Sequence, residues 1–149
     1  MFILGSIAEQ DIGQWHRFLF YFPLILFITA FICDILYYFG KNWAFTMGHW
    51  MVIFGVMMCV PTLATGLEAA QSFDPQNIFL IKHRFLGYAT GVSGSLYAGL
   101  RISVMWWKQP IFLPSHYVGL SFLLVALVFW TSDYGGLLLR VNPPHGIYK

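Results

Sequence analysis

Long apolar stretches alternate with short polar ones along this chain of 149 residues. Four of the apolar stretches are long enough to cross the hydrocarbon layer of a membrane as an α-helix. They cover about residues 18–39, 43–67, 78–107 and 111–139. Because the connections between them are short, consecutive helices should pack antiparallel. We expect an all-α, integral membrane, up-down four-helix bundle that forms a single domain over residues 1–149.

The chain also contains an internal repeat. The run HRFLFY at residues 16–21 returns as HRFLGY at residues 83–88, which is 67 residues later. Two tandem two-helix repeats, about 16–82 and 83–149, would have the same orientation in the membrane. An axis along the membrane normal should therefore relate the two halves of the bundle.

This axis places four histidines in two pairs. It exchanges the first helix with the third and the second with the fourth, which are the diagonal partners of a four-helix bundle. His16 should then face His83 near one membrane surface. The 67-residue offset also relates His49 to His116, and this pair should face each other near the other surface.

The composition restricts the class of protein. With 58% hydrophobic residues, 9% charged residues and a mean hydropathy of +0.68, the chain has too few charges to cover a soluble domain. A net charge of +2 with dispersed cations excludes nucleic acid as a partner. Both cysteines, Cys33 and Cys59, lie in apolar runs, and no Cys-x-x-Cys-His motif occurs for covalent haem attachment.

Paired imidazoles on diagonal helices indicate haem as the cofactor. One histidine alone usually marks a helix entrance at the interface, but four at matching depths favour ligation. A zinc site needs three or four ligands within reach of one another, and a di-iron site needs Glu-x-x-His pairs, which are missing from the sequence. We predict two non-covalent, bis-histidine haems b, with His16 and His83 ligating one iron and His49 and His116 the other.

Glycines and arginines near the entrance histidines fit this prediction. Gly87 and Gly91 follow His83 by four and eight residues on one helical face, where a porphyrin would lie flat; close helix packing is the alternative explanation. Arg17 and Arg84 directly follow the entrance histidines. They would pair with haem propionates or, alternatively, anchor the helices at the interface.

Two further charged residues are expected inside the membrane. Asp34 and Arg101 are equivalent under the 67-residue offset and should lie across the axis at one depth. Either they form an intramembrane ion pair, or Arg101 holds a propionate of the second haem.

The chain resembles two families. The paired histidines on diagonal helices resemble those of the di-haem membrane cytochromes b, which carry electrons between quinone and a redox partner. The helix entrances resemble a small bacterial four-helix membrane family of unknown function with the opening motif HPxxVHFP. His16 and Phe22–Pro23 match that motif, whereas Arg17 replaces its proline and Tyr21 its second histidine. Further matches are Gly55, Thr65–Gly66, His83, Arg101 and Gly135–Gly136.

The predicted function is that of a b-type di-haem cytochrome subunit carrying electrons across or within the membrane. Since little of the chain lies outside the bilayer, its partners besides lipid should be other subunits of a respiratory redox complex, such as a c-type cytochrome or a quinone-linked protein. The alternative is a haem-free structural or accessory subunit of a larger membrane complex. No hydrolytic centre is apparent, and an electron-transfer subunit of an oxidoreductase complex is favoured over an enzyme acting alone.

The distribution of basic residues predicts the orientation. The expected location is the bacterial inner membrane, with both termini in the cytoplasm. The face with the termini carries Arg17, Lys82, Arg84, Arg140 and Lys149, and the other face carries Lys41, Arg101 and Lys108.

Overall fold

Four long helices make up the computed structural model, which describes residues 2–107 and 113–141 and their side chains from residue 12 onward. The helices are α1 (Phe2–Tyr38), α2 (Asn42–Ala69), α3 (Ile78–Trp107) and α4 (Pro114–Val141), with a short 3-10 turn at Ala70–Ser72. The basic residues Lys108 and Lys149, used above to predict the orientation, lie outside the described residues.

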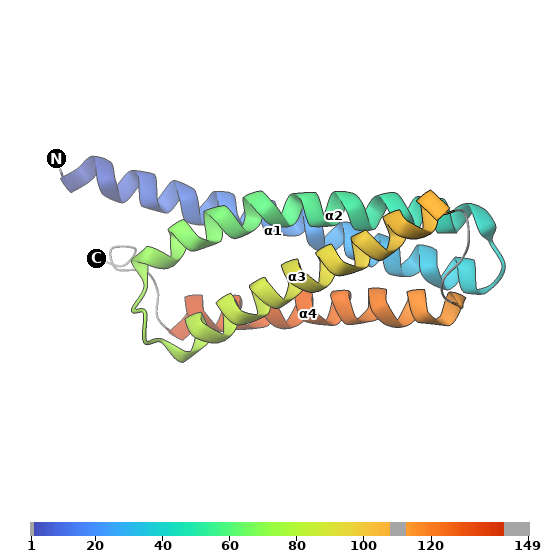
Figure 1. Ribbon diagram of the computed structural model, residues 1–149. Helices are drawn as coiled ribbons and strands as arrows, with labels where there is room; N and C mark the ends of the chain where they lie inside the picture. Colours follow the sequence, from blue (N-terminus) through green and yellow to red (C-terminus); the bar gives the residue numbers. More distant parts are fainter. Residues whose placement is uncertain (1, 108–112, 142–149) are drawn as a thin grey trace.

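The helices form the predicted up-down bundle. α1 packs against α2 and α4, and α3 packs against α2 and α4, so α1 and α3 are diagonal partners. Figure 1 shows that α1 begins and α4 ends at one end of the bundle, while the α1–α2 turn lies at the other. The predicted fold class is confirmed.

One helix boundary differs from the hydropathy pattern. Residues 2–15, which precede the first apolar stretch, continue α1 as regular helix, and Figure 1 shows this part projecting beyond the other helices. The polar residues before the apolar stretch interrupt the hydrophobic pattern but not the helix. None of them is a proline, and a helical backbone tolerates polar side chains.

Local sequence explains two of the connections. Gly40 has φ 85°, a left-handed conformation that suits glycine, and it ends α1 in a Schellman motif. In that motif, Gly40 N–H donates to Tyr37 O (2.9 Å) and Lys41 N–H to Leu36 O (3.0 Å). At the other end of the bundle, the Asn77 side chain caps α3 by accepting the Phe79 N–H (2.9 Å).

A large aromatic side chain fills the middle of the bundle. Phe27 of α1 is 1% exposed and lies against two glycines. A Cβ at Gly55 of α2 would be 2.5 Å from the Phe27 ring, and one at Gly94 of α3 would be 3.4 Å from it. Phe27 therefore separates the two ends of the interior, and a polar cluster lies at each end.

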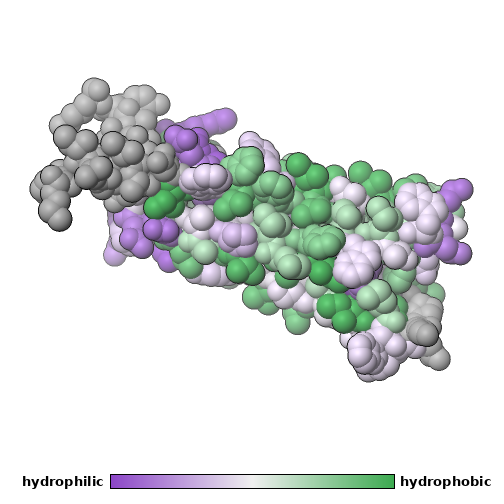
Figure 2. All heavy atoms as spheres, turned by 90° about the horizontal axis from the view of Figure 1, so that it is seen from above, coloured by the Kyte–Doolittle hydropathy of each residue, from purple (hydrophilic) through white to green (hydrophobic). Residues whose placement is uncertain are grey.

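The outer surface is that of a membrane protein. Figure 2 shows an apolar flank between hydrophilic ends. Within the described residues, three segments are long and apolar enough to span a membrane: Ile12–Tyr38, Asn42–Ser72 and Pro114–Val141. α3 has a similar length of 30 residues but carries more glycine and more charge. It packs lengthwise against both α2 and α4.

Candidate functional site

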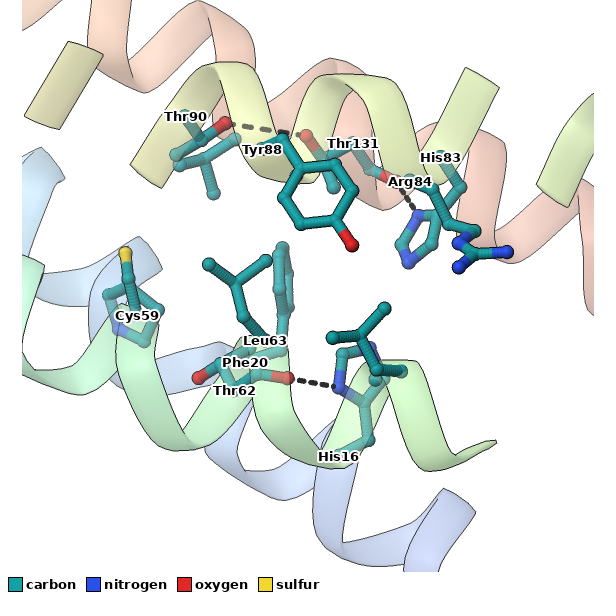
Figure 3. A pocket seen from close by; sticks show the side chains of 15 residues that line it. His16, Phe20, Cys59, Thr62, Leu63, His83, Arg84, Tyr88, Thr90 and Thr131 are labelled. Carbon is teal, nitrogen blue, oxygen red and sulfur yellow. Dashed lines mark hydrogen bonds between the residues drawn. The ribbon is translucent and has the colours of Figure 1, made fainter. Parts of the chain in front are cut away.

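A cavity between the four helices contains the entrance histidines. It lies near the end of the bundle where α3 begins, and every helix contributes to its wall (Figure 3). Its lining consists of His16, Phe20, Pro23, Cys59, Thr62, Leu63, Gly66, Leu67, His83, Arg84, Gly87, Tyr88, Thr90, Val128 and Thr131.

The backbone of α2 holds His16 in place. Its Nδ1 is 2.9 Å from the carbonyl oxygen of Thr62. The ring also lies close to Gly66, where a Cβ would be only 2.7 Å from Cε1 of the imidazole. A glycine one turn after the acceptor carbonyl thus lets the ring lie flat against the helix.

His83 has the same arrangement against α4. Its Nδ1 is 2.7 Å from the carbonyl oxygen of Thr131, and a Cβ at Gly135 would be 3.0 Å from its Cε1. Each entrance histidine therefore rests on a Thr-x-x-x-Gly segment of the next helix in the chain. The two halves of the site are built alike, as the predicted repeat requires.

These hydrogen bonds determine the tautomer of both rings. A carbonyl oxygen only accepts, so Nδ1 of each histidine must carry the proton and donate it. The lone pair is then on Nε2. In Figure 3, both rings lie at the edge of the cavity and face each other across it. A histidine whose Nδ1–H is held by a carbonyl is the usual arrangement of a metal-ligating imidazole.

The spacing of the two rings suits two ligands of one metal ion. Their centres are 6.1 Å apart and their planes are inclined by 89°. Two metal–nitrogen bonds of about 2.0 Å, with roughly 1 Å more from each nitrogen to its ring centre, put the centres of trans histidines about 6 Å apart. Among the described residues, His, Cys, Asp and Glu form no group of three or more that would hold a metal ion. The arrangement therefore supplies two protein ligands.

The cavity has a volume of about 70 Å³. Whether a macrocycle finds space there depends on Leu63, which forms one wall. Leu63 of α2 covers the glycine face of α3, because its methyl carbons are 3.6 Å and 3.2 Å from the positions of a Cβ at Gly87 and Gly91. These glycines therefore serve helix packing here, which was the alternative explanation. For a porphyrin to lie on this face, the Leu63 side chain must rotate away. Tyr88, which also lines the cavity, is 46% exposed and is not held in the interior.

The two arginines beside the histidines differ in their positions. Arg84 lines the cavity next to His83 (Figure 3). Arg17 is exposed and donates from Nε to Gly13 O (3.4 Å) on its own helix, and it is not part of the lining. The position of Arg84 suits a propionate partner, whereas that of Arg17 suits interfacial anchoring.

The second predicted pair of histidines differs in exposure, and its two rings are not presented to each other in the way His16 and His83 are. His49 of α2 is 1% exposed, whereas His116 is an exposed residue in the first turn of α4. A shift in the register of α4 explains the difference. Buried residues of α2 recur in α4 at an offset of 69 residues rather than 67: Val52 and Ser121, Gly55 and Leu124, Cys59 and Val128, Thr62 and Thr131.

The predicted partnership of Asp34 and Arg101 is confirmed as an ion pair. Arg101 Nη2 pairs with Asp34 Oδ1, and both side chains are fully buried. The hydroxyl of Tyr97 donates to Asp34 Oδ2 (2.8 Å) and accepts from Arg101 Nη2 (2.7 Å). The rings of Phe45, Tyr97 and Tyr117 surround the guanidinium at 4.9–5.4 Å. We call Asp34, Tyr97 and Arg101 the ion-pair cluster.

Important residues of the cavity escape a sequence-based prediction. Thr62 and Thr131 act through backbone carbonyls, which every residue possesses. The detectable signal is the Thr-x-x-x-Gly spacing, which occurs at 62–66 and again 69 residues later at 131–135. The Tyr97 hydroxyl is likewise identified only by its contacts.

Comparison with known proteins gives one match. The model of a family described as "Predicted membrane protein (DUF2231)" matches residues 15–142. Neither a curated protein nor a solved structure matches the chain. The matched range includes both entrance histidines, both Thr-x-x-x-Gly segments and the ion-pair cluster.

Proposed function

This chain belongs to the family described as predicted membrane protein (DUF2231), and we propose that it is an electron-transfer subunit that binds one haem b between His16 and His83. The observation that supports the proposal most strongly is the pair of facing imidazoles, each with Nδ1 held by a backbone carbonyl and its lone pair on Nε2. The match to the family supports the membrane setting and leaves the cofactor to be tested.

The residues around the cavity have distinct roles in this proposal. When bound there, haem b supplies one-electron chemistry between ferric and ferrous iron. The carbonyls of Thr62 and Thr131 orient the two rings and make Nε2 a stronger donor. Arg84 would balance a propionate at the rim, and the apolar lining from Phe20, Leu63 and Val128 excludes water.

The proposal includes one haem per chain rather than two. The burial of His49, the exposure of His116 and the pairing of Arg101 with Asp34 leave no second pair of imidazoles facing each other in the described interior. Electrons would therefore enter and leave near one membrane face. Since the described chain is almost entirely membrane helix, donor and acceptor must be other proteins of a redox complex or small carriers.

The orientation is also a proposal. The burial of Arg101 removes it from the interfacial charges, and the described cation that remains at this end is Lys41 on the α1–α2 turn. Described cations at the opposite end are Arg17, Lys82, Arg84 and Arg140. This asymmetry favours a bacterial inner membrane protein with the end carrying His16 and His83 toward the cytoplasm.

The test is spectroscopic. The full-length protein, expressed with a supply of haem and purified in detergent, should show one haem per chain in a pyridine haemochrome assay and a low-spin reduced-minus-oxidised spectrum. His16→Ala and His83→Ala should each abolish bound haem, while the control His116→Ala should retain it. A colourless preparation with native helical content would contradict the proposal and favour the haem-free accessory subunit. Haem that persists in both cavity variants would place it elsewhere.

A further inference from the structure

The polar groups at the end of the bundle opposite the cavity are not all hydrogen-bonded to one another. Arg101 donates from Nη1 to the carbonyl of Phe45 (3.3 Å) and from Nη2 to Asp34 and the Tyr97 hydroxyl. Its Nε–H has no hydrogen-bond partner among the residues that the structure describes. The guanidinium is fully buried, so bulk water does not reach this donor.

His49 on the neighbouring helix α2 also lacks hydrogen bonds. Its side chain is 1% exposed, and neither Nδ1 nor Nε2 has a hydrogen-bond partner in the described part of the chain. A neutral imidazole carries one N–H donor and one lone pair, so both go unused. Arg101 reaches α2 directly beside His49: its Nη1 donates to the carbonyl of Phe45, one helical turn before His49 (3.3 Å), and a Cβ at Gly48 would be 3.2 Å from the same nitrogen.

Unpaired polar groups are especially unfavourable in a membrane interior. A water molecule resolves both deficits, since it accepts from Arg101 Nε–H and donates to the lone pair of His49. The charge of the surroundings favours a neutral molecule over an ion, because Asp34 and Arg101 already compensate each other. At 1.5 Å per residue, His49 lies about 10 Å from the start of α2, near enough to the membrane surface for water to enter.

We propose that His49 and Arg101 form a binding site for an internal water molecule beside the ion-pair cluster. The site makes this end of the interior a hydrated pocket within the membrane and completes the hydrogen bonds of the buried guanidinium. It is independent of the proposed haem, which would lie on the far side of Phe27.

Water-edited solid-state NMR on the full-length protein in lipid bilayers tests the site. With labelled histidine, arginine and valine, magnetisation should pass from water to the His49 ring and to Arg101 Nε. It should not reach the side chain of Val52, which is fully buried on α2 and is the dry reference. His49→Gln assigns the ring signal. Transfer to His49 no faster than to Val52 would overturn the proposal.

A second variant tests the role of Arg101. Arg101→Lys keeps the positive charge beside Asp34 but removes the Nε–H donor, so transfer to the His49 ring should fall to the level seen at Val52. Unchanged transfer would show that Arg101 is not part of the site.

The thermal midpoint tests the same site in a different way. His49→Phe should lower it, because the water loses a partner, whereas the control Met47→Phe, at an exposed position on the same helix, should leave it nearly unchanged. A higher midpoint in His49→Phe would mean that the ring was unbonded and the water absent. Should Arg101→Lys fail to fold, the wild-type spectrum and this measurement still decide the question.

Discussion

At the scale of single residues, the entrance histidines are defined by what lies behind them. A flexible imidazole on a membrane helix has several rotamers, but a carbonyl on one side and a glycine under the ring restrict it to one. Gly66 and Gly135 are essential to this arrangement, because a side chain at either position would occupy the space of the ring. The two imidazoles of the proposed site are therefore preorganised before any ligand binds.

Gly135 can be compared directly with its neighbour. Gly135→Ala places a Cβ 3.0 Å from Cε1 of His83, whereas a Cβ at Gly136 has no atom within 4 Å. We expect Gly135→Ala to weaken haem binding roughly tenfold to a hundredfold, because the ligand loses its orienting carbonyl. Gly136→Ala should bind haem normally and gain up to about 1 kcal/mol of stability. Haem titration and thermal unfolding of both variants check this, and equal behaviour of the two would contradict it.

The ion-pair cluster predicts strong coupling between its two charges. Arg101→Leu or Asp34→Leu alone leaves a buried charge without a partner and should cost about 3–5 kcal/mol. The double variant should recover part of that loss, since neither charge remains. Unfolding free energies of the wild type, the two single variants and the double variant form the necessary cycle. Strictly additive losses would show that the pair does not contribute as a unit.

At the scale of helices, the close approach of α1, α2 and α3 depends on size complementarity. Phe27 occupies space that Gly55 and Gly94 leave open, and this contact sets how near the helices come. The same contact separates the cavity from the ion-pair cluster. The contact of Phe27 with the two glycines therefore both packs the helices together and divides the interior into two polar ends.

This complementarity makes a reciprocal prediction. Phe27→Ala should cost about 3–5 kcal/mol through the cavity it leaves, and Gly55→Ala should destabilise the protein because its Cβ would be 2.5 Å from the Phe27 ring. In the double variant the clash is absent, so Gly55→Ala should no longer be unfavourable. Chemical unfolding of the three variants measures this coupling. A penalty for Gly55→Ala that is unchanged in the Phe27→Ala background would show that the two residues are not in contact.

The composition of α3 has a consequence for membrane insertion. It is the one long helix among the described elements that is not apolar enough to span on hydropathy alone. We expect the isolated segment 78–107 to insert poorly and Arg101→Leu to improve its insertion by up to about 3 kcal/mol, the scale of a buried arginine. Glycosylation mapping of the segment in microsomes measures this, with segment 114–141 as the efficient control. Efficient insertion of the unmodified segment would contradict the prediction.

At the scale of the whole molecule, the two polar ends face opposite membrane surfaces. The cavity opens at the end with most of the basic residues, and the ion-pair cluster lies toward the α1–α2 turn. The up-down topology places the beginning of α1 and the end of α4 on one side. The orientation of the chain therefore decides which compartment the proposed redox site serves.

Reporter fusions test this orientation. A fluorescent protein fused after Lys149 should be active in the cytoplasm, and alkaline phosphatase inserted at the α1–α2 turn should be active in the periplasm. The physical reason is the retention of basic segments on the cytoplasmic side. The opposite pattern would reverse the proposed side of the redox site. Lys82→Ala and Arg140→Ala together provide a control for the charge effect, because they should weaken the bias without touching the cavity ligands.

Much of the fold could be predicted from the sequence. The four helices and the membrane setting follow from hydropathy and helix length, which are local properties of the chain. The 67-residue repeat correctly placed His16 opposite His83 and Asp34 beside Arg101. These predictions succeeded because α1 and α3 keep one common register, so that equivalent letters occupy equivalent depths.

Only the tertiary structure decided the register of α4 and the surroundings of the histidines. Buried positions of α2 and α4 are offset by 69 residues rather than 67, so His49 is buried while His116 is exposed. The carbonyls of Thr62 and Thr131 become acceptors only because neighbouring helices turn them toward the rings. Every residue has a carbonyl, so its availability depends on helix rotation and depth, and these result from packing among all four helices.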